Sequence, residues 1–259
     1  MQIDSLLKYA NPTKPFVNAV KNLYSHKLSK SLTSLDGKIC YTNTVGKRYY
    51  PGITRTIKKK YFADFKYPTR RTRVKASSSI STGTRVHRQI HHIYSCLKKK
   101  TCDCKTKTNL KRLHACTKAV QEFLLDMEIV PDSTEYPIVS PTLKLATSLD
   151  MIGTRWPNTQ NARSVIISLK TGYSAGYDAN SSGQKLSKPL ETYESTSQHH
   201  NQLQAIVEYE ILANDYGIEF DDYYIVYLKQ TKDAAYNVEV LKSSTLFRIE
   251  KERIYKGLG

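Results

Sequence analysis

Two neighbouring segments carry side chains that could take part in hydrolysis. Asp150 lies in a β-prone run over residues 143–155, and Ser168, Leu169 and Lys170 end the next such run. If the two runs pair across the turn between them, Asp150 and Lys170 meet at the same end of a hairpin. The carboxylate and the Leu169 carbonyl could then ligate Mg²⁺, while Lys170 orients or helps to deprotonate a water molecule, as phosphodiester hydrolysis requires. Taken alone, an aspartate and a lysine on adjacent strands more often form a surface ion pair.

The segments around this pair predict an α/β fold. Apolar residues recur at helical spacing after the polar turn at 77–84, and after Pro131 the pattern becomes extended. We expect one or two short helices within residues 5–30 and a loop from there to Asn43. Further helices are expected at 84–97, 110–127, 199–215 and the C-terminus, and strands at 136–140, 143–155, 164–170, 223–229 and 237–242. The first three strands should form a meander, and the whole order is typical of layered α/β domains.

The positive charge of the chain is concentrated in its first half. Residues 1–120 contain 27 Lys or Arg residues against 4 Asp or Glu residues, whereas residues 121–259 contain 13 against 19. An excess of this size in one region would repel itself without a negatively charged partner. Nucleic acid is therefore the favoured partner, with an anionic membrane surface as the main alternative.

Basic residues alternate with tyrosine and proline between residues 48 and 75, which suits base stacking between phosphate contacts. The same tyrosines could instead form a hydrophobic patch, and an amphipathic basic helix would favour a membrane. We expect residues 1–76 to form a basic, aromatic-rich extension that grips DNA and residues 77–259 to form the catalytic core. The candidate DNA-binding residues are Arg48, Tyr50, Arg55, Lys58, Lys59, Lys60, Arg70, Arg71, Arg73 and Arg85.

Four of the five cysteines lie in a Lys-rich insert at 96–116, which is not the distribution of a disulfide framework. Cys96, Cys102, Cys104 and Cys116 could bind a structural zinc ion with nearby histidines, but ordinary reduced cysteines are the favoured interpretation. A reducing intracellular setting, nuclear or cytoplasmic, fits this usage, and a mitochondrial transit peptide remains an alternative. No stretch is apolar enough for a membrane span, so no membrane partner is expected.

Several short motifs occur in an order that resembles a known family. They are a GxxxHxxI pattern over residues 83–90, ISLKTG over 167–172 and QLQ over 202–204, with Tyr209 following. This ordered set resembles the RecB-type branch of the PD-(D/E)XK nucleases. The YPGIT element at 50–54 is similar to one that precedes the catalytic domain of mitochondrial genome-maintenance exonucleases, and the QxQ spacing is similar to lambda-exonuclease-like (YqaJ) relatives.

The resemblance implies a fold, an activity and a set of site residues. It implies a restriction-endonuclease-like core, in which helices flank a central mixed β-sheet, and a DNA exonuclease that uses Mg²⁺ or Mn²⁺ in replication, repair or recombination. The metal ligands would be His87, Asp150 and the Leu169 carbonyl, with Glu135 as a further acid. Lys170 would be the catalytic lysine, and Gln204 the glutamine near the site, with Gln202 as its alternative.

One position departs from the family pattern. The family has Asp or Glu two residues before the lysine, whereas this chain has Ser168, whose hydroxyl is a much poorer Mg²⁺ ligand than a carboxylate. Either another acid such as Glu135 or Glu128 compensates, or the site is weakened. The second case would leave a catalytically inactive nuclease fold that serves as a DNA-binding module.

Overall fold

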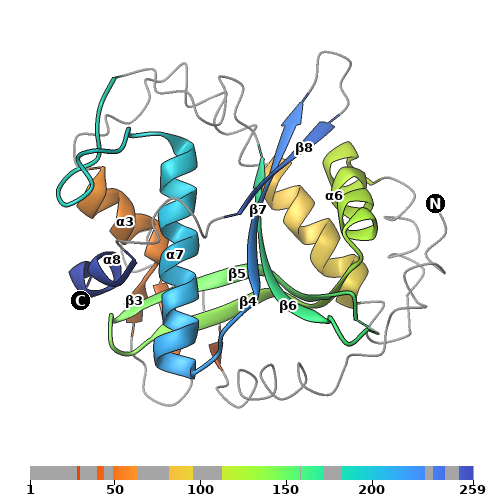
Figure 1. Ribbon diagram of the computed structural model, residues 1–259, viewed down its shortest axis with the longest axis horizontal. Helices are drawn as coiled ribbons and strands as arrows, with labels where there is room; N and C mark the ends of the chain where they lie inside the picture. The colour runs from red at the N-terminus through yellow and green to blue at the C-terminus, as the bar shows by residue number, and fades with distance from the viewer. Residues whose placement is uncertain are drawn as a thin grey trace.

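A computed structural model describes nine segments of the chain, residues 28–29, 40–43, 49–62, 82–95, 113–157, 159–171, 183–230, 236–242 and 251–258. Its strands are β1 (Leu28–Ser29), β2 (Cys40–Asn43), β3 (Tyr49–Pro51), β4 (Ile129–Ser140), β5 (Leu145–Arg155), β6 (Arg163–Thr171), β7 (Asp222–Gln230) and β8 (Tyr236–Lys242). Its labelled helices are α3 (Ile53–Tyr61), α6 (Ala115–Asp126), α7 (Ser197–Tyr216) and α8 (Lys251–Leu258). A further helix, unlabelled and gold in Figure 1, spans 82–95.

The central sheet has five strands in the order β4-β5-β6-β7-β8. The first three strands follow one another as antiparallel neighbours, which confirms the predicted meander. β6 and β7 are parallel because α7 provides the crossover connection between them, and β8 returns antiparallel to β7. The predicted α/β architecture, a mixed sheet flanked by helices, is thus confirmed.

Helices cover both faces of this sheet, as Figure 1 shows, with α3, α7 and α8 on one side and α6 and the 82–95 helix on the other. The strand residues alternate between two cores. Ile166 and Ile225 pack in the core beneath α7, whereas their neighbours Ile167 and Val226 pack in the core beneath α6. Because side chains alternate along a strand, the near-continuous apolar runs of β6 and β7 are what a sheet covered on both faces requires.

The structure differs from the sequence predictions in three larger respects, each by more than two residues or in the type of element. β4 begins at Ile129 rather than at 136, and it includes Pro131 and Pro137 because it is an edge strand, where a missing backbone N–H is tolerated. α6 begins at Ala115 rather than near residue 110, since His114 is extended and its ring accepts the Cys116 N–H. β1, β2 and β3 form a separate three-stranded sheet. The sequence had predicted a helix at residues 28–29, which form β1, and a loop at residues 40–43, which form β2.

The basic segment after residue 48 forms an amphipathic helix, which the sequence reasoning did not assign. In α3, Ile53, Ile57 and Tyr61 recur every four residues and are fully buried, while the lysines between them are exposed. The buried side belongs to the core beneath α7. A segment of the predicted extension therefore contributes to the core of the sheet domain. Within the described segments, no helix combines the length and the hydrophobicity of a membrane span.

Candidate metal centre

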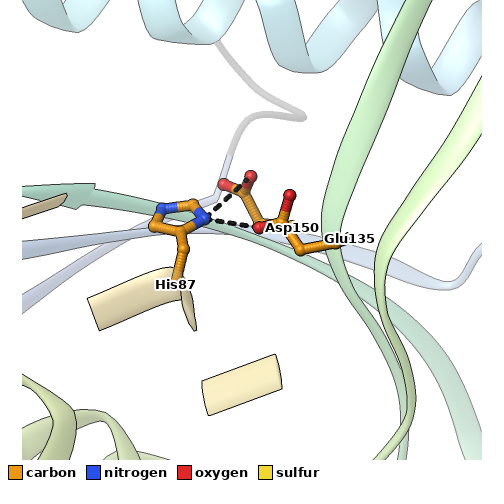
Figure 2. Close-up of side chains that lie close together, drawn as sticks. All are labelled: His87, Glu135 and Asp150. Atoms are coloured by element: carbon orange, nitrogen blue, oxygen red, sulfur yellow. Dashed lines mark hydrogen bonds and ion pairs between the residues drawn. The ribbon is translucent and has the colours of Figure 1, made fainter. Parts of the chain in front are cut away.

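Three side chains from three elements converge near the middle of β5. His87 comes from the 82–95 helix, Glu135 from β4 and Asp150 from β5, and Figure 2 shows them pointing toward one another. His87 Nδ1 lies 2.7 Å from Glu135 Oε1 and 3.6 Å from Asp150 Oδ1. One ligand atom from each residue fits within a mutual distance of 4.8 Å. One imidazole nitrogen and two carboxylates at this separation could hold a divalent metal ion.

The sheet itself brings the two carboxylates together. Glu135 stands opposite Asp150 in the β4–β5 register, between the pairs Thr134↔Met151 and Tyr136↔Leu149. Directly opposite residues of an antiparallel pair project from the same face. Glu135 has a φ of 53°, a left-handed conformation that is uncommon for residues other than glycine, and this local irregularity occurs at the proposed ligand itself.

β6 orients the Asp150 carboxylate. The β5–β6 ladder ends at the pair Met151↔Ile167. Asp150 therefore lies just beyond the last residue of β5 that pairs with β6. Its Oδ2 accepts hydrogen bonds from the Leu169 backbone N–H at 2.8 Å and from the Ser168 hydroxyl at 3.1 Å. One carboxylate oxygen is thus held by β6, and the other faces His87.

A close approach between the 82–95 helix and β6 places His87. A Cβ on Gly83 would lie 2.9 Å from Thr171 Oγ1, so a larger residue would push the start of this helix away from the end of β6. One turn later His87 reaches the carboxylates, while Val86 and Ile90 are buried and anchor the helix on the sheet. The GxxxHxxI pattern thus combines a contact glycine, a site histidine and an anchoring apolar residue.

The charges around His87 favour its protonated form when no metal is bound. Burial acts to lower the pKa of His87, but the Asp150 charge and the hydrogen bond and charge of Glu135 raise it more, and Lys170 opposes them in part. The net effect is a raised pKa. Since a metal ion binds only the neutral imidazole, metal binding would release this proton.

Lys170 and Ser168 both project from the α7 face of β6, because they alternate with the side chains of Ile167 and Leu169. The positive charge of Lys170 lowers the pKa of His87, His200 and Glu208, which places the ammonium within electrostatic reach of all three groups. The structure therefore joins Asp150 to Ser168 by a hydrogen bond and places Lys170 on the same face of β6, within electrostatic reach of His87.

The two glutamines predicted near the site lie on α7 and are buried. Gln204 donates a hydrogen bond from Nε2 to Glu208 Oε1 at 2.8 Å, and its Oε1 is 3.5 Å from the Thr54 hydroxyl of α3. Gln202 is 1% exposed. Glu128, considered as a compensating acid, is exposed at the turn before β4 and does not belong to the metal-binding group.

Sequence reasoning missed Glu208 and Tyr223, which lie on the same side of the sheet as Ser168. Glu208 is 1% exposed and accepts hydrogen bonds from Tyr223, Gln204 and Thr147. One signal was available. Glu208 follows Gln204 by four residues on a helix whose flanking residues are apolar, so the two side chains share one buried face.

The candidate DNA-binding residues are distributed unevenly. Arg55, Lys58, Lys59 and Lys60 are exposed on α3, which packs against α7, and Arg85 is exposed near the start of the 82–95 helix. Tyr50 is 6% exposed and packs against Val139 and Ala146, so the structure places it in a core and not on a surface where it could stack on bases. Arg48, Arg70, Arg71 and Arg73 lie outside the described residues.

Only one residue of the predicted zinc group can be placed. Cys116 is fully buried in the core beneath α6. Cys96, Cys102 and Cys104 lie outside the described residues, so the zinc hypothesis stays a prediction.

Comparison with known proteins gives only a distant structural similarity. No protein-family model matches the chain, and no curated protein matches it. Among solved structures, a protein from Eubacterium rectale named "Putative exonuclease" is similar with a TM-score of 0.37 and 10% sequence identity, over 81% of this chain and 76% of that one. A similarity at this level does not define a family, and the functional assignment therefore depends on the geometry of the site.

Proposed function

We propose that the protein is a divalent-metal-dependent deoxyribonuclease of the exonuclease type. The observation that carries this proposal is the convergence of His87, Glu135 and Asp150 beside Lys170. A mixed nitrogen and carboxylate donor set of this kind suits Mn²⁺ and Mg²⁺, with the nitrogen ligand favouring Mn²⁺. When bound, such an ion would polarise a phosphate oxygen and lower the pKa of a coordinated water molecule.

The residues around the metal centre have distinct roles in this proposal. His87, Glu135 and Asp150 hold the ion, with the Leu169 carbonyl as a further candidate ligand. Lys170 orients the attacking water and neutralises charge on the scissile phosphate. The hydrogen bonds from Ser168 and Leu169 fix the rotation of the Asp150 carboxylate, so that the ligand oxygen is in place before the metal binds.

The basic face of α3 supports DNA as the substrate. Lys58, Lys59 and Lys60 are exposed on a helix that packs against α7 and contacts Gln204 through Thr54. Phosphate groups of a bound strand would be held along this helix and directed toward Lys170. When lysine side chains neutralise phosphates in this way, the affinity for DNA falls steeply as the salt concentration rises. A role in DNA replication, repair or recombination follows from such an activity and belongs to the same proposal.

The test is metal-dependent cleavage of end-labelled single- and double-stranded DNA in the presence of Mn²⁺, Mg²⁺ or EDTA. Wild-type protein should cleave with metal, and Asp150→Asn should show only the background seen with EDTA. Asp132→Asn is the matched control, because Asp132 lies on β4 and bonds Thr154 outside the metal-binding group. Cleavage that persists in Asp150→Asn would place the active site elsewhere.

A second candidate function is favoured by Ser168, namely a nuclease fold retained as a DNA-binding module without activity. Ser168→Asp separates the two functions. If the site is already complete, an added carboxylate beside Asp150 introduces repulsion and activity changes little or falls, which is the expected outcome. A wild-type protein that is inert with both metals, combined with an active Ser168→Asp variant, would instead support the binding module.

A further inference from the structure

Two histidines lie one turn apart on the 82–95 helix, and the metal centre uses only the first of them. His87 and His91 are four residues apart, so their side chains project from the same face of the helix. Val86 and Ile90, on another face, are buried against the sheet. His91 is exposed, and the side chain of His87 is 24% exposed. Dissolved ions can therefore approach both imidazole rings from solvent.

Consecutive residues of β4 hold the two rings in the same orientation. His87 Nδ1 lies 2.7 Å from Glu135 Oε1, and His91 Nδ1 lies 2.8 Å from Thr134 Oγ1. Within the described part of the chain, the Nε2 atom of neither ring has a hydrogen-bond partner. Figure 2 shows the second ring nitrogen of His87 pointing away from both carboxylates. Because both Nδ1 atoms face β4, both Nε2 atoms are turned away from it on the same side of the helix.

The contact with Glu135 decides which nitrogen of His87 is available to an ion from solvent. A carboxylate accepts hydrogen bonds and does not donate them, so Nδ1 carries the proton and Nε2 has the free lone pair of the neutral ring. Histidines that ligate a metal usually donate their other ring N–H to an acceptor in this way. Two histidines four residues apart on one helix face can bind a single zinc ion, and imidazole donors suit zinc better than magnesium.

We propose that His87 Nε2 and His91 Nε2 together bind a zinc ion at a second metal site, with water completing its coordination. His87 belongs to both sites but cannot serve both in the same way. To ligate an ion between Glu135 and Asp150 through Nδ1, it must release the proton that it shares with Glu135. Binding zinc through Nε2 keeps that proton in place. Zinc therefore withdraws His87 from the metal centre and inhibits Mn²⁺-dependent cleavage.

The zinc site depends only on the contacts of the two histidines, whereas the inhibition also rests on the proposed function. The first test is NMR of isotope-labelled histidine ring nitrogens in the full chain, titrated with Zn²⁺ alone. The signals of the two rings are assigned from His87→Gln and His91→Gln. Their Nε2 signals should shift together, and His87 Nδ1 should stay protonated. In His91→Gln the zinc-dependent shift of His87 Nε2 should be lost.

Two further variants separate this site from other zinc ligands of the chain. Thr134→Val keeps both rings but removes the contact that orients His91, and it should weaken zinc binding roughly 10-fold. His92→Gln is the matched control. It removes the adjacent imidazole, which projects about 100° further around the helix, and it should bind zinc as the wild type does.

The position of the shifts decides the outcome. Zinc that shifts His87 Nδ1 instead of Nε2 would be bound in the metal centre, and zinc held by cysteines would leave both rings unchanged. Either result would overturn the second site. An undiminished shift of His87 Nε2 in His91→Gln would also overturn it, because His91 would then not be a ligand.

Cleavage with Mn²⁺ at increasing Zn²⁺ concentrations tests the inhibition. His91→Gln should cleave as the wild type does without zinc, and it should remain active at zinc concentrations that inhibit the wild type. Equal zinc sensitivity of the two proteins would refute the withdrawal of His87. A wild-type protein that is inactive with Mn²⁺ would refute the proposed function and the inhibition, while the NMR shifts would still decide the zinc site.

Discussion

The two faces of the central sheet are both covered by helices, but they bury different kinds of side chain. Beneath α6 the core is mainly aliphatic and aromatic, with Leu124, Val165 and Val226 among its members. On the other face, α7 carries every described histidine or acidic residue that is almost fully buried, namely His200, Glu208 and Glu210. Polar groups on α7 thus occupy positions where apolar ones would give a more stable core.

This difference indicates a division of roles with one exception. The core beneath α6 mainly stabilises the fold and the buried polar groups beneath α7 lie on the same side of the sheet as Ser168, whereas the candidate ligand His87 comes from the 82–95 helix on the α6 side. An aliphatic core gains stability from burial alone. Buried ionisable groups cost stability unless they are paired, and a protein retains them where their charge or orientation is needed. We therefore expect substitutions beneath α6 to change stability, and substitutions beneath α7 to change metal binding, activity and pH dependence.

The largest expected effect is on activity, at Lys170. Lys170→Met keeps most of the side-chain volume but removes the charge that would stabilise the developing negative charge on the phosphate, so kcat should fall roughly 10²–10³-fold. Salt-dependent DNA binding should be largely retained, because it depends on many other basic groups. Single-turnover cleavage and fluorescence anisotropy measure the two properties, with Lys118→Met on α6 as the control. An equal loss of both would contradict a catalytic role.

The next effect concerns stability on the other face. Leu124 is a residue of α6 whose side chain is fully buried in the core between α6 and the sheet. Leu124→Ala should lower the free energy of unfolding by about 2–5 kcal/mol, because apolar burial is reduced and a cavity is left behind. Urea denaturation measures this change. The folded variant should bind Mn²⁺ with wild-type affinity. A marked loss of metal affinity would show that the two faces do not act independently.

A smaller effect is the pH dependence caused by His200. Burial, followed by the charges of Lys58 and Lys170, lowers the pKa of His200 to about 3, so the ring is neutral in the folded protein. The unfolded chain takes up a proton below pH 6.5, and stability should therefore be lost as the pH falls from 6.5 toward about 3. This single group contributes a slope of about 1.4 kcal/mol per pH unit.

Unfolding free energies of wild type and His200→Gln between pH 7 and pH 5 test this expectation. The variant lacks the titrating ring and should show a shallower loss of stability toward acid pH. Parallel curves would mean that His200 is accessible to protons in the folded state.

The smallest effect lies on the surface of α3. Lys58→Gln combined with Lys59→Gln should reduce the salt dependence of DNA binding, with the slope of log K against log salt falling by about 1 for each phosphate that is no longer neutralised. Lys118→Gln, on α6 and away from α3, should leave the slope unchanged. An unchanged slope in the double variant would place the DNA path elsewhere.

Much of the candidate metal centre could be predicted from the sequence because strand pairing is local. Asp150 and Lys170 are separated by one hairpin, and the period-2 pattern of their strands sets which residues meet. His87 was found through its motif at a helix start. Glu135 was considered only as a further acid, because the sequence did not show that β4 extends back to Ile129 and sets Glu135 opposite Asp150.

The sequence by itself determined the order of helices and strands from residue 84 onward, since hydrophobic period, turn residues and helix caps act over a few residues. Only the tertiary structure decided that α3 belongs to the core, that Tyr50 is buried, and that donors from β5, α7 and β7 converge on Glu208. These interactions join residues far apart in the chain or place an amphipathic segment against a distant helix. Local pattern cannot encode them, because the partner that a buried face will meet is fixed only when the whole sheet has assembled.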